Sequence, residues 1–325
     1  MPELKPYNAE ELAAALGRLP LENASCFAVA CSGGADSLAL TLLLHEWARA
    51  QGKTVIALHV DHQLRATSHA EAQTLKAWLD SHQIPLEILP WHHEGITSRI
   101  QERAREARYQ LLQAAASRHQ IEHLFLAHHL KDQEETFWMR LLKGSGTDGL
   151  AGMKPVSKRG NLTLLRPILN VHPERLRLFL NSHNQEWIQD PSNENPQYLR
   201  IRLRQLLRES STEYSPEMLG YSMEKLREDA DFMNAATDTW IANTVESSHT
   251  QFRCQKSALI SLHPALGKRV LKKLLQRLHP TPYPPRSEAL NRLWAQLQSA
   301  QFRATTLGHC LIRQSKGHLI FQREE

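Results

Sequence analysis

The stretch Ser25-Cys-Phe-Ala-Val-Ala-Cys-Ser-Gly-Gly-Ala-Asp-Ser37 decides the fold. An apolar run of strand length ends there in two glycines, and a helical run over 38–50 follows at once. Gly33 and Gly34 lack a Cβ atom, so the backbone can turn sharply and approach a ligand closely, while the first N–H groups of the next helix point at that ligand. This order of strand, glycine turn and helix predicts a binding site for phosphate.

The polar side chains of the turn indicate a polyphosphate bound together with a metal ion. Ser32 and Ser37 add hydroxyl donors, whereas the negative charge of Asp36 favours phosphate only when Mg²⁺ lies between them. The spacing matches neither G-x-x-x-x-G-K-[ST] nor G-x-G-x-x-G, which weakens the P-loop NTPase and dinucleotide-binding interpretations. A structural alternative stays open, in which the glycines form a tight turn and Asp36 and Ser37 cap the helix.

Length and composition limit the class of protein. A chain of 325 residues is long enough for two domains, and 41% hydrophobic with 22% charged residues is ordinary for a globular protein. We expect a cytoplasmic protein with no membrane segment, because no apolar run approaches ~20 residues and no signal peptide is recognisable. The four cysteines contain no C-x-x-C pair, which argues against structural zinc, an iron–sulfur cluster and a disulfide framework. The net charge of +5 is compatible with a polyanionic partner.

Apolar runs of strand length alternate with helical runs over most of the chain. After the first strand we expect strands at 54–60, 86–89, 123–129 and, at an edge, 163–169, and helices at 8–19, 36–50, 68–82, 97–119, 132–143 and from Pro173. This alternation predicts an α/β fold with a Rossmann-like, mainly parallel sheet and helices on both faces. We place this domain at 1–215. Residues 216–325 are expected to form a smaller, mostly helical domain that ends in a hairpin turning at Ser315-Lys-Gly317.

Two loops allow both a functional and a structural interpretation. Asp61, His62 and Arg65 follow a predicted strand at the end where ligands bind in open α/β sheets, and they could equally form a polar loop. The glycine-rich turn 144–149 is either a flexible cover over an active site or the stop signal of a helix.

The segment Ser32-Gly-Gly-Ala-Asp-Ser37 resembles the S-G-G-x-D-S signature of the N-type ATP pyrophosphatases, the PP-loop superfamily. The resemblance implies that ATP is cleaved between its α- and β-phosphates and that AMP is transferred to an oxygen of the substrate. Three further segments are similar in order and spacing to the tRNA(Ile)-lysidine synthetase family: 128–136, 140–153, and Arg166-Pro167 leading to Trp187, Asp190-Pro-Ser-Asn193 and Tyr198-x-Arg200. The similarity spans about residues 25–208.

That resemblance implies a ligase that forms a C–N bond on tRNA. With ATP and Mg²⁺, such an enzyme adenylates the C2 oxygen of the wobble cytidine in the CAU anticodon of tRNA(Ile). The ε-amine of free L-lysine then displaces AMP, which gives lysidine, AMP and pyrophosphate. The implied partners are tRNA(Ile), contacted by the C-terminal domain, and free lysine. A homodimer is one possible oligomeric state.

Matching the family motif residue by residue implies the following site. ATP would be bound by Ser32, Gly33, Gly34, Ala35, Asp36, Ser37, His128 and His129, with Asp36 also the Mg²⁺ ligand. Lysine would be bound by Arg108, Asp132 and Glu135, and the catalytic set would be Asp36, Arg108, Asp132, Glu135 and Arg200. Asp132 and Glu135 are three residues apart and so share one helix face. Structural alternatives remain: Asp132 as a helix cap, Glu135 in an ion pair, and Arg200 as a solvated charge.

Two positions depart from the family pattern, because Lys131 stands where the family usually has aspartate and Ile201 where it usually has asparagine. The related tRNA 2-thiocytidine class would show paired cysteines, and the amidating synthetases would bring an ammonia source; neither feature is in this sequence. From a different class, the chain could be a nucleotide-binding module that contacts RNA without chemistry. Pyrophosphate release from ATP in the presence of tRNA and lysine distinguishes an enzyme from that module.

Overall fold

The computed structural model describes residues 4–21, 24–64, 67–93, 100–189, 202–203, 207, 215–248, 250–281 and 285–324. The chain divides into two compact units, Met1–Leu226 and Arg227–Glu325, and the division falls within helix α9 (Pro216–Thr244). The domain boundary placed after residue 215 from the sequence stays a prediction. None of the helices in the described ranges combines the length with the hydrophobicity that crossing a bilayer requires.

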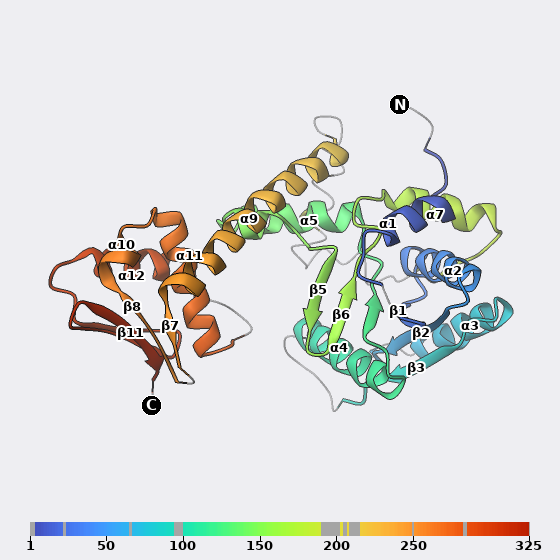
Figure 1. The fold of residues 1–325 in the computed structure, drawn as a ribbon. Coiled ribbons are helices and arrows are strands. Elements are labelled where there is room, and N and C mark those ends of the chain that lie inside the picture. The colour runs from blue at the N-terminus through green and yellow to red at the C-terminus, as the bar shows by residue number, and fades with distance from the viewer. Residues whose placement is uncertain are drawn as a thin grey trace. The chain divides into compact units, whose positions relative to one another are not determined.

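The N-terminal unit is built on a six-stranded sheet with the order β3-β2-β1-β4-β6-β5 (Figure 1). All neighbours in it are parallel except β5 and β6. The strands are β1 (Cys26–Ala30), β2 (Thr54–Asp61), β3 (Leu86–Pro90), β4 (His123–Phe125), β5 (Val156–Arg159) and β6 (Leu162–Leu165). The mainly parallel sheet expected from the alternating pattern is confirmed.

The strand predicted at the edge of the sheet lies inside it. The sequence predicts an edge strand at 163–169, but β6 ends at Leu165 and lies between β4 and β5, so that β5 occupies the edge. β5 has a single strongly apolar residue, Val156, and edge strands tolerate polar and charged residues because one side of their backbone faces solvent. Its hydrophobic signal was therefore too weak to identify it.

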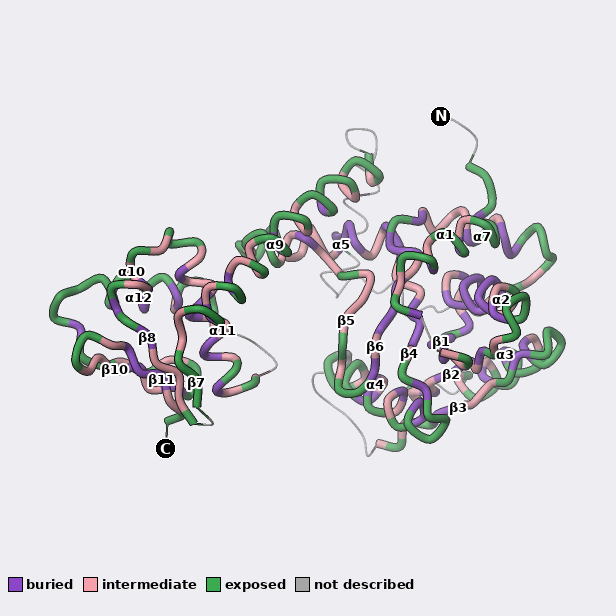
Figure 2. Tube along the Cα trace, in the orientation of Figure 1, coloured by how far each residue is buried: buried purple, intermediate pink, exposed green. Residues whose placement is uncertain are grey.

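Helices cover both faces of this sheet, as expected. The helices described before α9 are α1 (Ala9–Leu16), α2 (Ala35–Ala50), α3 (Ser68–Ser81), α4 (Ile100–Arg118), α5 (Leu130–Leu141), α6 (Thr147–Leu150) and α7 (Pro173–Ser182). Phe27 and Val29 pack with α1, α2, α3 and α7, whereas Ala28 and Ala30 pack with α4 on the opposite face. Figure 2 shows α2 and the central strands as buried. Side chains that alternate between two cores mark a sheet covered on both sides.

The C-terminal unit has its own core and contains more sheet than the sequence predicted. Its further helices are α10 (Lys256–Ile260), α11 (Pro264–Leu278) and α12 (Ser287–Gln298). An antiparallel sheet of order β7-β8-β11-β10-β9 joins β7 (Glu246–Ser247), β8 (Gln251–Gln255), β9 (Ala304–Leu307), β10 (Cys310–Ser315) and β11 (His318–Arg323). The predicted hairpin forms from β10 and β11, but β8 and β9 extend it on either side. The amphipathic pattern over 264–299 predicts a helical stretch, but the structure divides it into two helices, α11 and α12, separated by a proline-rich segment.

Candidate active site

The glycine turn after β1 is held by its two serine side chains. The Ser32 N–H donates to Ser37 Oγ over 3.1 Å, the two hydroxyl oxygens lie 3.0 Å apart, and the Ser37 hydroxyl donates to the Gly34 carbonyl oxygen over 3.0 Å. Gly34 is the N-cap residue of α2 and makes no side-chain cap hydrogen bond. Asp36 and Ser37 therefore lie inside the first turn of α2 and do not cap it, so backbone N–H groups at the helix start can meet an anion.

Gly33 is required at its position for two reasons. Its φ of +84° is in the left-handed region, and a Cβ atom there would lie 2.5 Å from Ile188 Cδ1. The Ile188 N–H also donates to the Gly33 carbonyl oxygen over 2.9 Å. The segment around Ile188 thus packs directly on the turn. No local pattern in the sequence marks Ile188, because its contact with Gly33 joins residues distant along the chain.

The loop after β4 supplies the second side of the site. His129 precedes α5, and its N–H donates to Asp132 Oδ2 over 3.1 Å. Its Nε2 atom lies 3.3 Å from Asp36 Oδ2 and 3.6 Å from Asp132 Oδ2. Asp36 and Asp132 thus share one histidine although they follow different strands. β1 and β4 are neighbours at the point where the strand order reverses, which is where open α/β sheets bind ligands.

The two adjacent histidines have opposite electrostatic surroundings. Burial lowers the pKa of His129, but the hydrogen bond to Asp36 and the charges of Asp132 and Glu135 outweigh it, so this pKa is raised. At His128, burial lowers the pKa to about 4, against the attraction of Asp132 and with further lowering by nearby guanidinium groups. His129 therefore favours the cationic form between carboxylates, and His128 is neutral at neutral pH.

The residues expected to bind lysine lie at the same edge of the sheet. Glu135 is buried on α5, one turn after Asp132, and its charge reaches His129. Arg108 is half-buried on α4, and its charge acts on His59 and His128, which belong to the carboxyl ends of β2 and β4. Burial lowers the pKa of Arg108.

The structure therefore brings together six residues of the expected site: Asp36, Arg108, His128, His129, Asp132 and Glu135. Arg200 lies outside the described residues, as do Arg65, Ile201 and the segment 190–200.

Lys131, which departs from the family pattern, pairs with a residue of its own helix. Its Nζ atom lies 3.0 Å from Glu134 Oε2, and the Glu134 side chain is 1% exposed. Burial raises the pKa of Glu134, while the hydrogen bond and charge of Lys131 oppose that rise. The lysine thus compensates a buried carboxylate.

Two residues of α5 that are not among the predicted site residues anchor the glycine-rich loop to this helix. The Gln133 amide donates to the Met153 carbonyl oxygen over 2.9 Å and accepts from the Met153 N–H over 2.7 Å. Arg140 donates to the carbonyl oxygens of Gly149 and Gly152 over 2.7 and 3.1 Å. α5 ends at Leu141, three residues before Gly144, and the glycine-rich loop that follows contains α6 and is fixed by these bonds. The seven-residue spacing of Gln133 and Arg140, which puts them on one helix face, was the available signal.

The carboxyl end of β2 is hydrogen-bonded to the segment that leads into the turn after β1. His59 Nδ1 donates to the Cys31 carbonyl oxygen over 2.9 Å, and Asp61 is buried with its Oδ1 accepting from the Gln63 N–H over 2.9 Å. Asp61 thus has a local structural role, in agreement with the structural interpretation of the loop that begins with it.

The surroundings of Asp36 fit a magnesium ion that takes most of its ligands from a substrate. Asp36 Oδ1 is buried and has no hydrogen-bond partner among the described residues, while Oδ2 faces His129. Within the same described ranges, no group of three His, Cys, Asp or Glu side chains could enclose a metal. Mg²⁺ commonly binds through one or two carboxylates together with water and substrate phosphates, so a single carboxylate is an adequate protein ligand.

Comparison with known proteins agrees with this geometry. Residues 5–210 match the family model of the PP-loop domain. The tRNA(Ile)-lysidine synthase of Hyphomonas neptunium is 35% identical over 320 residues, covering 96% of this chain and 85% of that protein. The tRNA(Ile)-lysidine synthase of Orientia tsutsugamushi is 39% identical over 181 residues, covering 56% of this chain but only 41% of that protein. The chain thus spans less than half the length of the second relative.

A solved structure shares the fold. The U34-tRNA thiolase NcsA of Methanococcus maripaludis, described with its [4Fe-4S] cluster, superimposes with a TM-score of 0.57 at 17% identity, covering 68% of this chain and 78% of that one. At this identity the likeness concerns the fold alone.

Proposed function

The chain belongs to the tRNA(Ile)-lysidine synthase family of ATP-dependent PP-loop ligases, and from that membership we propose that it converts the wobble cytidine of tRNA(Ile) with a CAU anticodon into lysidine. The substrates are ATP, free L-lysine and the tRNA. The reaction has two steps, and each half of the site described above serves one of them.

In the first step the C2 oxygen of the cytidine attacks the α-phosphorus of ATP, and the bond to the β-phosphate breaks to release pyrophosphate. Ser32, Ser37 and the backbone N–H groups at the start of α2 hold the phosphates. Asp36 would hold Mg²⁺ through Oδ1, and the ion would neutralise phosphate charge when bound.

In the second step the ε-amine of lysine attacks C2 of the adenylated cytidine, a C–N bond forms, and AMP leaves. Asp132 and Glu135 bind the positive charge of lysine, and Arg108 balances these two carboxylates. Because His128 is neutral at neutral pH, it adds no cation that would repel the incoming lysine. The amine must lose a proton before it attacks, which burial of the site favours.

One observation supports this proposal above the others. His129 Nε2 lies within 3.6 Å of Asp36 Oδ2 and of Asp132 Oδ2, so the phosphate cradle and the acidic pair adjoin. A pure nucleotide-binding module has no need for a second acidic group beside the cradle.

The test is transfer of labelled lysine to tRNA. The protein is incubated with ATP, labelled lysine and an unmodified tRNA(Ile) transcript, in parallel with a transcript in which only the wobble cytidine is replaced by uridine. We expect label and an equal amount of pyrophosphate with the first transcript only. Pyrophosphate release without label would point to another nucleophile, and release of neither product would favour the RNA-binding module.

A further inference from the structure

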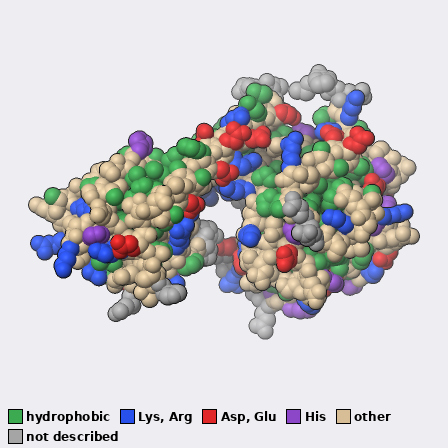
Figure 3. All heavy atoms as spheres, viewed as in Figure 1, with side chains coloured by type: hydrophobic (Ala, Val, Ile, Leu, Met, Phe, Trp, Pro, Cys, Tyr) green, Lys and Arg blue, Asp and Glu red, His purple; other side chains and the backbone are tan. Residues whose placement is uncertain are grey.

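The positive charge of the chain lies in its C-terminal unit. Residues Arg227–Glu325 contain 14 Lys and Arg and eight Asp and Glu, which leaves 25 and 26 for Met1–Leu226. The C-terminal unit therefore has a formal charge of +6 and the N-terminal unit −1. On the face shown in Figure 3, Lys and Arg side chains gather at the far left of the C-terminal unit. A polyanionic partner is attracted mainly to this unit.

Many of these cations already have partners inside the unit. Lys273 and Arg277 both pair with Asp238 of α9, at 2.5 and 2.8 Å. Lys268 and Arg269 donate to asparagine side chains over 2.8 and 3.2 Å. Arg286 is the N-cap residue of α12 and Arg292 lies within that helix; both are exposed, and their side chains form no hydrogen bond or ion pair with any residue that the structure describes. They remain available to an external anion.

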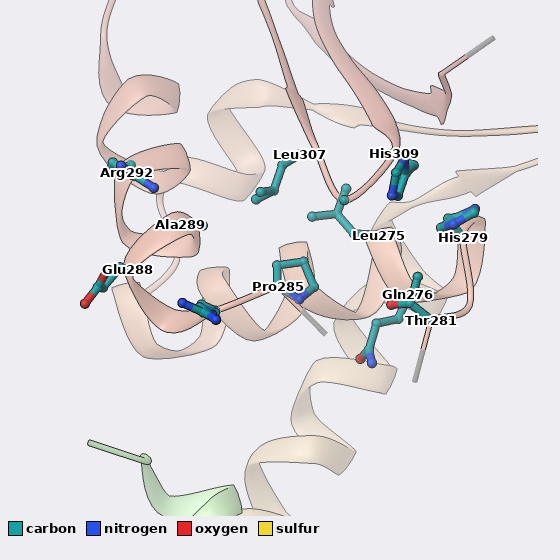
Figure 4. Close-up of a pocket in the computed structure, with 12 residues that line it drawn as sticks. Leu275, Gln276, His279, Thr281, Pro285, Glu288, Ala289, Arg292, Leu307 and His309 are labelled. Carbon is teal, nitrogen blue, oxygen red and sulfur yellow. The ribbon is translucent and has the colours of Figure 1, made fainter. Parts of the chain in front are cut away.

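These two arginines line a pocket of about 320 Å³. His279 and His309 line it as well, with ring centroids 4.9 Å apart and planes at 51°, and Pro285 and Leu307 contribute apolar surface. Figure 4 shows the two imidazoles together on one side, Arg292 on the opposite side and Pro285 between them. The lining thus combines flat rings, apolar surface and cations.

His309 occupies a left-handed turn position at which glycine is the preferred residue. Gly308 and His309 form the turn between β9 and β10, with φ values of +61° and +59°. In such two-residue turns glycine is preferred at the second position, as in the Lys316–Gly317 turn of this same sheet. Histidine is one of the non-glycine residues that adopt the left-handed region more often than most, and at this position its ring lines the pocket.

We propose that this pocket binds one unstacked nucleotide of the RNA substrate, with the base against the imidazoles and the apolar surface and its phosphate on Arg286 and Arg292. Aromatic side chains and arginine are the usual partners of unpaired RNA bases and their phosphates. Glu288 also lines the pocket; its carboxylate disfavours a bare phosphate but can accept a hydrogen bond from an amino group of a base. The proposal rests on the proposed function in taking tRNA as the RNA.

The test compares two double variants in the full chain. Arg286→Ala with Arg292→Ala removes the pocket cations, and Arg303→Ala with Lys316→Ala removes the same charge at exposed positions of the same unit that do not line the pocket. With unmodified tRNA(Ile) transcript as the probe, the pocket pair should raise Kd by about tenfold or more, and the control pair by less than about threefold. Equal weakening by both pairs would show an effect of net charge alone and overturn the proposal.

A third variant distinguishes the effect of the His309 ring on RNA binding from an effect on the stability of the fold. His309→Gly removes the imidazole at a φ that glycine accepts readily, so Tm should stay equal or rise, while Kd for the tRNA should increase about fivefold or more through loss of one stacked base. Affinity for a blunt RNA duplex should not change, because all its bases are stacked. An unchanged Kd for tRNA, or an equal loss for the duplex, would overturn the proposal.

The two proposals can fail separately. If the wild-type chain transfers lysine while all pocket variants bind tRNA normally, the pocket proposal is wrong and the function stands. If the wild-type chain transfers no lysine but the variants weaken RNA binding as described, the function is wrong and the pocket stands. Absence of any tRNA binding by the wild-type chain would overturn the pocket proposal.

Discussion

His129 is the residue on which the candidate site converges, because its imidazole contacts carboxylates that follow two different strands. It was expected only to line the nucleotide site. The carboxylates of Asp36 and Asp132 raise the pKa of His129, and the imidazole, when protonated, reduces the repulsion between these two acids. Single substitutions at this site should therefore affect the two steps differently.

Asp36→Asn should lower pyrophosphate release by about 100-fold or more, because an amide oxygen is a much weaker ligand for Mg²⁺ than a carboxylate. Release is measured with ATP, tRNA and lysine all saturating. Asp80→Asn is the matched control, since Asp80 is exposed on α3 and pairs with Lys76. Normal turnover by the Asp36 variant would contradict the assigned role.

Asp132→Asn should raise the KM for lysine by about tenfold, the usual loss for one charged hydrogen bond, and spare formation of the adenylated tRNA. Asparagine keeps an oxygen that can accept the His129 N–H, so the start of α5 should survive. Adenylation and lysine transfer are measured separately, by pyrophosphate release and by label incorporation. Loss of adenylation with an unchanged KM for lysine would show that Asp132 acts on ATP instead.

His128 should make the fold less stable in acid. Its pKa is lowered to about 4 in the folded chain, against about 6.5 when unfolded, so below the unfolded value the unfolded chain binds the proton more readily. The contribution of neutral His128 to the free energy of unfolding is therefore fully present above about pH 6.5, and it is lost as the pH decreases toward about 4. His128→Gln should lose less urea resistance than wild type between about pH 7.5 and about pH 5. Equal losses would contradict the assignment.

At the scale of elements, the site depends on where each element ends. β4 stops at Phe125 instead of the expected residue 129, which leaves 126–129 as a loop that positions both histidines. α5 begins at Leu130, so Asp132 lies in its first turn and Gln133 and Arg140 can hold the glycine-rich loop. The turn after β1 also depends on its backbone conformation, because Gly33 has a positive φ.

Gly33→Ala should lower both Tm and ATP affinity. Alanine at a φ of +84° costs about 1–2 kcal/mol, and its Cβ would also press on Ile188. Adding Ile188→Ala removes the contact but not the backbone cost, so the double variant should recover part of the Tm. Ile188→Ala alone serves as the control. Full recovery in the double variant would show that φ contributes nothing at this position.

At the scale of the whole molecule, charge is divided unevenly between the two units. The N-terminal unit carries Asp132, Glu135 and the turn at Gly33 and Gly34, while the C-terminal unit carries the net positive charge. On the proposed function, which requires binding of a lysine cation and of a polyanion, the separation keeps the acidic and the basic groups from neutralising each other.

Binding of tRNA should consequently depend strongly on salt. Lys and Arg contacts to phosphates release counterions, so Kd should rise about tenfold or more between about 50 mM and about 200 mM salt. The measurement is a titration of labelled tRNA(Ile) transcript at several salt concentrations. A Kd that does not change over this range would mean that few phosphates are contacted.

The amino-acid sequence by itself determined the local features of this protein. Asn8 caps α1, Pro173 begins α7 and the apolar runs mark the parallel strands, because capping, φ restriction and hydrophobic periodicity act between residues close along the chain. The turn at Gly33 and Gly34 was predictable for the same reason. The short edge strand β5 was not, since it carries little hydrophobic signal.

Only the tertiary structure decided which of these features meet. Asp36 and His129 are about 90 residues apart and come together because β1 pairs with β4, an adjacency that no local pattern specifies. No local pattern specifies that β8 and β9 pair with the predicted hairpin either. Nor does one specify that α11, α12 and the β9–β10 turn meet to form the pocket. Strand pairing and helix packing join residues distant in the chain, so the choice among partners rests on the free energy of the whole fold.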